Sequence, residues 1–474
     1  MKPLIFAMIL VVSVIGLPAW SRGQENPNQT SDADRAAPTP ALSGVVGIDS
    51  EETADETQTN LPQIPTLLGG PRMSLSVGGE QGRSNYLRGG INVGVAYDDN
   101  VHLDPRNSQG TPIYSVFPNI ALEQTTSRIQ TRLAYAGGIT INQELSDSNQ
   151  GAHDFSFDTQ YRLSPHANLH VAEDFYLTTG LFDSGIGSNV ANGGGVTNPS
   201  IITPLARERS SSTVVETNYQ FSLNDVIGGS GSYNALHFSD VPVGTQLVDS
   251  QTASASAFWF HGLFRRDWAG VSYRFDRLTF EPSGGETLVH SIFVVNTLTL
   301  SRHVTISAFV GPEYSDNRGV AASGPNAGSL SEFSEWSAAG GVEAGWRNDK
   351  TSFAGGFSSR VSNGAGLLGV SRTQAIHGDF RRELSPGWII GLNAAYAKNR
   401  ALTVPVAGSS TDVDNTTVGA SVERNIGRRL GVRLSYSHDF QQQGYSAVPL
   451  QTLDAHRNRV SLTLGYQWAK ALGR

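Results

Sequence analysis

Arginines and carboxylates alternate with apolar residues along several extended segments of this 474-residue chain. Charges placed in that way act on a nearby solute through their electric field. The candidates are Arg132, Asp158, Arg162, Arg274, Asp276, Glu343, Arg347, Arg360 and Arg433. Two interpretations are open. In the first, which is favoured for any single residue, the charges pair with one another across a wet interior and serve only its hydration. In the second, they shape the electric field on a permeating solute.

Bond-making chemistry has weaker support in the sequence. Serines, aspartates and 11 histidines are available, but spacing alone does not identify a catalytic triad. The chain has no Gly-x-Ser-x-Gly elbow, His-Glu-x-x-His motif, phosphate-binding loop or spaced metal cluster. It also has no cysteine, which excludes disulfides, cysteine-ligated metals and cysteine nucleophiles. We therefore expect no enzyme activity, no catalytic residue, no cofactor and no metal site.

Two short motifs combine an aromatic residue with carboxylate and amide side chains. They are Tyr97-Asp98-Asp99-Asn100 and Tyr314-Ser315-Asp316-Asn317. Such clusters are candidates for binding calcium or sugar hydroxyls. The favoured interpretation is simpler: an aromatic residue at a membrane interface is followed by residues that form turns.

Hydrophobic periodicity predicts the elements that carry these residues. From Ile129 to Ile141, apolar residues occupy most alternate positions, and polar or very small residues lie between them. A period of two over this length predicts a long β-strand that is wet on one side. Similar segments recur to the C-terminus, for example at 271–276, 336–347 and 460–468. Long amphipathic strands in series predict a transmembrane β-barrel.

The connections between these segments alternate in length. Short ones fall at 125–127, 163–166, 222–225, 263–266, 301–303, 347–350, 384–387 and 426–429. Longer ones, above all 183–204 and 316–332, are predicted surface loops. The rhythm predicts an all-β, antiparallel up-and-down barrel of about 18 strands, and 16 strands stay an alternative because 227–239 is poorly patterned. An even number places both ends of the barrel domain on the periplasmic side.

The composition agrees with this fold class. Charged residues make up 16% of the chain, against about 25% in a typical soluble domain. The mean hydropathy is only −0.23, but barrel strands face lipid at every second residue, so a membrane barrel keeps a low mean. The net charge of −8 argues against nucleic acid as a partner.

The first 87 residues predict two segments without a packed core. Residues 1–21 combine Lys2, an apolar run and small residues before a cleavage position, which predicts a secretory signal peptide. Residues 22–87 are polar and rich in turn formers, which predicts a disordered periplasmic tail ahead of a barrel at 88–474. The apolar patch at 61–68 in this tail is a candidate for docking periplasmic export partners or for plugging the lumen.

Aromatic residues mark both ends of the predicted strands, as in the interfacial girdles of membrane barrels. Trp468 closes the last strand. Those that precede polar loops are Tyr97, Phe175, Tyr176, Tyr314, Tyr396 and Tyr436. Glu173 is a misfit, because it falls on the apolar register of its strand. We expect a β-bulge or a protein-facing site there.

The first hairpin region, residues 90–133, contains the strand end Val95-Ala96-Tyr97-Asp98-Asp99-Asn100-Val101. A second strand follows as Ile113-Tyr114-Ser115-Val116-Phe117-Pro118-Asn119-Ile120. The pattern is a Tyr-Asp-x-Asn strand end followed by a proline-containing strand. In this pattern the region resembles the β-barrel porin 2 family. The resemblance implies an outer-membrane barrel of poorly defined function, sometimes linked with exopolysaccharide export systems. The tail is not part of the matched pattern.

Two functions follow from these expectations. The first is a porin-like channel that lies in the lipid of the outer membrane of a Gram-negative-type bacterium and passes polar solutes or a polysaccharide. The alternative is a structural or adhesive surface barrel that displays extracellular loops. A soluble β-sandwich is disfavoured, because long strands with terminal aromatic residues suit a bilayer better.

Overall fold

The structure, a computed structural model, describes residues 84–101, 103, 108–143, 150–178, 206–240, 247–281, 285–320, 330–364, 366–402, 410–427, 429–445 and 451–472. Within these ranges no helix is long and apolar enough to cross a membrane. The signal peptide expected at 1–21 lies outside the described residues. So does the tail expected at 22–87, except for its last four residues, because the first strand begins at Ser84.

The described residues form 18 strands: β1 (Ser84–Asp98), β2 (Thr111–Thr125), β3 (Ile129–Asn142), β4 (Gln150–Ser164), β5 (Ala167–Thr178), β6 (Arg207–Gln220), β7 (Asp225–Ser239), β8 (Asp249–Phe264), β9 (Asp267–Glu281), β10 (Gly285–Ser301), β11 (Val304–Val320), β12 (Leu330–Arg347), β13 (Thr351–Gly364), β14 (Leu368–Ser385), β15 (Trp388–Ala401), β16 (Ser410–Ile426), β17 (Leu430–Tyr445) and β18 (Gln451–Ala471).

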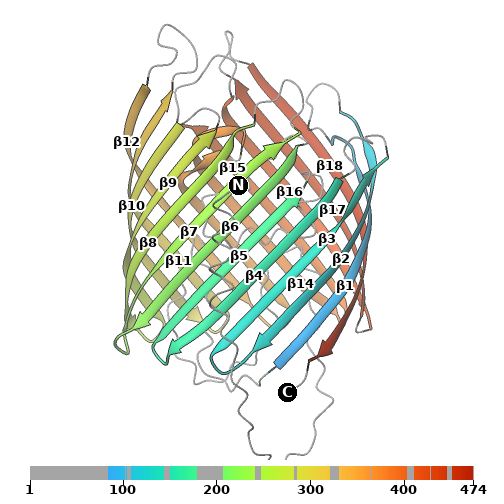
Figure 1. Ribbon diagram of the computed structural model, residues 1–474, viewed down its shortest axis with the longest axis horizontal. Coiled ribbons are helices and arrows are strands. Elements are labelled where there is room, and N and C mark those ends of the chain that lie inside the picture. Colours follow the sequence, from blue (N-terminus) through green and yellow to red (C-terminus); the bar gives the residue numbers. More distant parts are fainter. Residues whose placement is uncertain are drawn as a thin grey trace, which may run out of the picture. The chain divides into compact units, whose positions relative to one another are not determined.

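All of these strands belong to one antiparallel sheet that closes on itself (Figure 1). Each strand pairs with its neighbours in sequence, and β1 also pairs with β18, from Tyr86 opposite Ala471 to Asp98 opposite Arg459. The predicted up-and-down barrel of 18 strands is therefore confirmed. It includes β7, which covers the poorly patterned segment.

The eight short connections join the strands at one end of the barrel, where the sequence predicts them. Local hydrogen bonds make them tight. In the β12–β13 turn, the Asn348 side-chain oxygen accepts hydrogen bonds from the amides of Lys350 and Thr351 at 3.0 and 2.8 Å. The chain enters β1 and leaves β18 at this same end, where the Leu472 amide donates to the Asn85 carbonyl at 2.9 Å. Short turns of outer-membrane barrels face the periplasm, so this is the periplasmic end.

The barrel exterior is apolar. Exposed large apolar side chains alternate along the strands with side chains that face the lumen, and near the middle of β10 and β11 Ile292, Val294 and Val310 are 57%, 60% and 62% exposed. Such a surface is costly in water, whereas lipid hydrocarbon accommodates it. A closed, even-stranded antiparallel barrel with this exterior is the architecture that crosses the outer membrane of Gram-negative-type bacteria, and the chain is an outer-membrane barrel.

Candidate functional site

One hairpin leaves the wall of the barrel and enters the lumen. β13 pairs with β12 only from Ser352 to Ser359, whereas its pairing with β14 continues to Gly364. Along its outer part β12 therefore pairs with β11 alone among the described strands. We call residues 360–364 and 366–372, at the outer ends of β13 and β14, the inward hairpin.

Apolar packing holds the inward hairpin against the lumen face of the wall. Val361 and Val370 form one buried cluster with Leu278 of β9 and Val289 of β10, whose side chains point into the barrel. The Val361 amide, which no longer pairs with β12, donates a hydrogen bond to Glu313 Oε1 at 3.1 Å. A side chain of β11 thus replaces the backbone partner that β13 gives up when it leaves the sheet.

The tip of the inward hairpin reaches β7 and β8. Gly366 has a φ of 88° and packs against the Phe238 ring. Its carbonyl accepts a hydrogen bond from the Val248 amide at 2.8 Å. Asn363 Nδ2 donates to Ser250 Oγ at 3.3 Å. These contacts join the β13–β14 hairpin to wall strands that are distant in the sheet order, so the hairpin crosses part of the lumen.

Charges of both signs gather where the inward hairpin meets the wall. Arg274 Nε donates to both carboxylate oxygens of Asp276 at 2.9 and 2.8 Å, and both side chains are 8% exposed. Ser254 donates to Asp276 Oδ1 at 2.5 Å. Arg360 of the hairpin interacts electrostatically with Arg274, Asp276 and Glu313. We call Arg274, Asp276, Glu313 and Arg360 the constriction cluster.

An ion pair joins the inward hairpin to β12. Arg372 Nη1 donates to Glu335 Oε1 at 3.2 Å, and the two side chains are half-buried. The constriction cluster contains two arginines and two carboxylates, so its formal charges cancel. Arg274, Asp276 and Glu313 are at most 6% exposed, so most of the cluster is enclosed between the inward hairpin and the wall.

The charged residues predicted to face the lumen occupy positions that alternate with exposed apolar exterior residues, but only three of them meet at the hairpin. Arg274, Asp276 and Arg360 belong to the constriction cluster. The other six lie nearer the periplasmic ends of their strands: Arg132, Asp158, Arg162, Glu343, Arg347 and Arg433. Some of these have close partners there.

Arg132 lies opposite Asp158 in the β3–β4 register, and Asp158 Oδ2 is 2.8 Å from His170 Nε2. Arg433 lies opposite Glu423 in the β16–β17 register. These neighbours match the interpretation in which lumen charges pair with one another. Any effect of the six residues on a solute would be exerted at the periplasmic mouth, away from the hairpin.

Sequence reasoning missed Glu313, Glu335 and Arg372. Glu313 and Glu335 alternate with Tyr314 and Trp336, so strict application of the period of two finds both of them on the lumen face. Arg372 is different, because it shares the register of Ile376, which lies 54% exposed on the exterior. Its side chain meets Glu335 only because the hairpin has turned inward, and the local pattern holds no signal for that turn.

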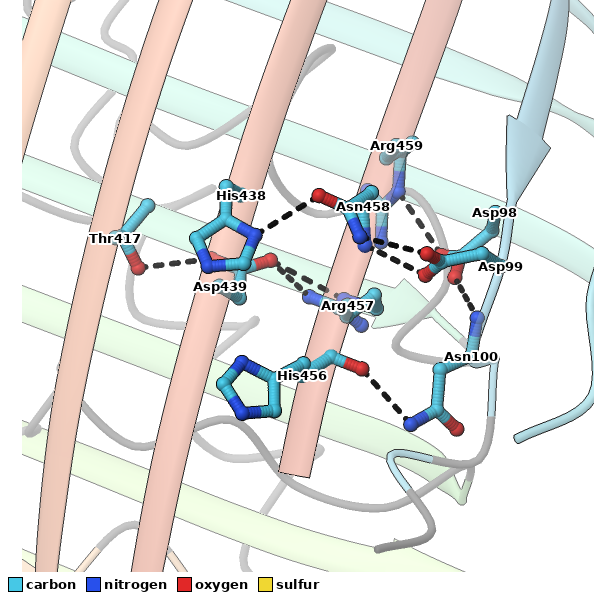
Figure 2. Close-up of polar contacts among 10 residues, drawn as sticks. All are labelled: Asp98, Asp99, Asn100, Thr417, His438, Asp439, His456, Arg457, Asn458 and Arg459. Carbon is cyan, nitrogen blue, oxygen red and sulfur yellow. Dashed lines mark hydrogen bonds and ion pairs between the residues drawn. The ribbon is translucent and has the colours of Figure 1, made fainter. Parts of the chain in front are cut away.

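The Tyr97–Asn100 motif closes the barrel at its outer rim (Figure 2). Asp98 accepts a hydrogen bond from Arg459 Nε at 3.2 Å, and Asp99 accepts hydrogen bonds from the amide and side chain of Asn458, each at 2.6 Å. Both carboxylates thus join β18 to the end of β1. In the described part of the chain, no group of three or more His, Asp or Glu is arranged to hold a metal ion.

Glu173 points to the exterior without the expected β-bulge. Residues 172–174 of β5 pair in regular register with residues 212–214 of β6. The Thr213 hydroxyl, on the same exterior face, donates a hydrogen bond to Glu173 Oε2. A hydroxyl on the neighbouring strand therefore satisfies one oxygen of this carboxylate, and the backbone is undistorted.

No protein-family model matches the chain, and no curated protein matches it. Among solved structures, it is similar to the outer membrane protein OpdK from Pseudomonas aeruginosa, with 10% identity, a TM-score of 0.40 and coverage of 81% of this chain and 99% of that chain. It is also similar to OprD from Pseudomonas aeruginosa, with 10% identity, a TM-score of 0.41 and coverage of 82% of this chain and 96% of that chain. A third similar structure is the ferric citrate transporter FecA, with 10% identity, a TM-score of 0.39 and coverage of 80% of this chain and 78% of that chain. The assignment to an outer-membrane barrel rests on the strand pairing and the apolar exterior.

Proposed function

We propose that the barrel is a porin-like channel that passes small polar solutes across the outer membrane. The observation that carries this proposal is the inward hairpin. A barrel of 18 strands is too wide for its own wall side chains to fill. The inward hairpin occupies part of this lumen, and a narrower lumen limits the size of the solutes that pass.

A polysaccharide is the less favoured cargo. The resemblance to the β-barrel porin 2 family suggests export of such a chain. A periplasmic partner that binds the tail at 22–87 would favour this alternative. A folded hairpin across the outer part of the lumen obstructs a continuous sugar chain more than it obstructs small solutes. The structural or adhesive alternative needs no passage at all and predicts that the barrel does not conduct.

Single-channel recording in planar bilayers tests the channel. The mature chain and a variant that lacks residues 61–68 are compared, and stable conductance steps are expected from at least one of them. Arg360→Ala removes one positive charge from the constriction cluster. It should shift the permeability ratio of cation to anion upward by about twofold, because the constriction cluster then carries a net negative charge.

Arg347→Ala is the matched control, because it removes the same charge at the exposed periplasmic end of β12. Salt screens exposed charges, so the permeability ratio should change much less. Equal shifts in the two variants would show that the inward hairpin is not the narrowest part. Folded protein without conductance steps in either chain length would contradict the channel and favour a barrel that displays loops.

A further inference from the structure

Two exposed arginines lie close together on the barrel exterior at the periplasmic end. Arg382 of β14 is opposite Ile390 of β15, and Arg424 of β16 is opposite Trp388, the first residue of β15. Trp388 and Leu392, on the same face of β15, are 38% and 52% exposed. We call Arg382, Trp388 and Arg424 the arginine–tryptophan site.

No carboxylate of the described residues neutralises this site. Neither Arg382 nor Arg424 forms a side-chain ion pair or hydrogen bond with another described residue. The carboxylates next to them in sequence, Glu383 and Glu423, both lie opposite Ile389 on the lumen face. The exterior positions around the arginines on these strands are apolar: Phe380, Leu384, Ile390, Leu392, Val422 and Ile426.

Exterior arginines near the outer end of the barrel are different. Arg277 of β9 pairs with Glu286 at 2.6 Å, and Arg318 of β11 pairs with Asp316 at 2.9 Å. The protein therefore neutralises these cations itself. The arginine–tryptophan site has two positive charges and no internal partner, so its complement is an anion that lies beside the barrel.

The geometry of the site suits a phosphate group. The guanidinium carbon of Arg424 lies 4.9 Å from the centroid of the Trp388 ring. Stacking of this kind holds the guanidinium in place and leaves the N–H groups at its edge free to donate to a planar fork of oxygens. Arg382 is two strands away and offset by two residues, which puts the two Cα atoms about 12 Å apart. Two long side chains at that separation reach one phosphate from opposite sides.

The surface next to the site suits acyl chains. Leu392 and Val422 lie further from the periplasmic end on β15 and β16, and they are 52% and 39% exposed. An anion at the arginines would therefore lie at the level of lipid headgroups, with apolar protein surface toward the membrane centre. Tryptophan and arginine are also the residues that favour this interfacial level.

We propose that the arginine–tryptophan site binds an anionic phospholipid of the periplasmic leaflet, with its phosphate between Arg382 and Arg424. The site has no carboxylate for the ammonium group of a zwitterionic headgroup, so phosphatidylglycerol is favoured over phosphatidylethanolamine. This inference goes beyond the proposed channel and does not depend on conduction, because every residue of the site faces the exterior.

Native mass spectrometry of the purified barrel in detergent micelles tests the site. Phosphatidylglycerol and phosphatidylethanolamine with identical acyl chains are the probes, and the dissociation constant should be at least about fivefold lower for phosphatidylglycerol. Arg382→Gln with Arg424→Gln should remove this preference, whereas Arg382→Lys with Arg424→Lys, which keeps both charges, should retain part of it. Equal affinity of the unmodified barrel for the two lipids would overturn the proposal.

The matched control removes the same charge elsewhere at the periplasmic end. Arg128→Gln with Arg265→Gln changes exposed arginines in the separate β2–β3 and β8–β9 turns, and the dissociation constant should stay within about twofold. An equal loss of affinity in the two double variants would show general attraction to a basic rim and would contradict a built site.

Tryptophan quenching supplies a second measurement that needs no arginine variant. The barrel is folded into vesicles that contain a minor fraction of phosphatidylglycerol or phosphatidylethanolamine with brominated acyl chains. The quenching that disappears in Trp388→Phe, which isolates the signal of Trp388, should be at least about twofold larger with the brominated phosphatidylglycerol. Equal quenching by the two lipids would mean that the site does not select an anionic headgroup.

Discussion

At the scale of single residues, the ion pair between Asp439 and Arg457 predicts a strong energetic coupling. Arg457 Nη2 donates to Asp439 Oδ2 at 2.9 Å, the side chains are 8% and 7% exposed, and Thr417 donates to the other oxygen of Asp439 at 2.8 Å (Figure 2). Arg457→Met should lower the free energy of unfolding by about 3 kcal/mol, because it leaves a buried carboxylate without its cation. Urea unfolding in lipid vesicles measures the change.

The double variant supplies the control for this coupling. Asp439→Leu alone should cost a similar amount, because a buried guanidinium then lacks its anion, whereas Asp439→Leu with Arg457→Met removes both charges. The double variant should therefore be more stable than the sum of the single changes predicts, by about 2 kcal/mol. Strict additivity would mean that the two side chains contribute independently.

The period of two predicts which face of a strand a residue lies on. It predicts that Arg274, Asp276 and Arg360 face the lumen, and in the structure Arg274 and Asp276 lie on the regular strand β9 whereas Arg360 begins the inward hairpin. It cannot tell that these three side chains meet, because the sheet alone does not bring β13 close to β9. Only the inward turn of the hairpin does, and that turn depends on packing between residues about 80 positions apart in the chain.

At the scale of elements, Gly366 holds the inward hairpin in place and predicts how the passage widens. A side chain at this position would meet the Phe238 ring, and its φ of 88° is strained for any residue with a Cβ. Gly366→Ala should push the hairpin tip off β7 and weaken the hydrogen bond from the Val248 amide. We expect single-channel conductance to rise by about 1.5-fold or more, recorded in the chain length that shows conductance steps.

The matched control is Gly427→Ala in the β16–β17 turn. Gly427 also has a positive φ, 65°, but a Cβ there meets no atom within 4 Å. Both changes should cost about 1 kcal/mol of stability through backbone strain. Only the change at Gly366 should alter conductance, and an equal effect of Gly427→Ala would show that the conductance responds to general loosening of the barrel.

Strands and turns could be predicted from the sequence because each is a local property. Alternation over 12 to 21 residues fixes the face of a strand, and short clusters such as 347–350 fix the turns. The inward hairpin is not local in this sense. Residues 351–372 read as an ordinary pair of wall strands, and their outer part leaves the wall because Val361 and Val370 find apolar partners on β9 and β10.

At the scale of the whole molecule, the barrel has two faces in different solvents, and charge insertion should distinguish them. Val294 lies at the middle of the exterior and is 60% exposed, and Ala395 is exposed on the lumen face. Val294→Lys should lower the free energy of unfolding in lipid bilayers by about 2 to 4 kcal/mol, because its ammonium group lies in hydrocarbon. Ala395→Lys, which adds the same charge on the wet face, should change it by less than about 1 kcal/mol. Folding yields and urea midpoints in vesicles give both values, and equal losses would mean that the exterior of the barrel is not in contact with lipid.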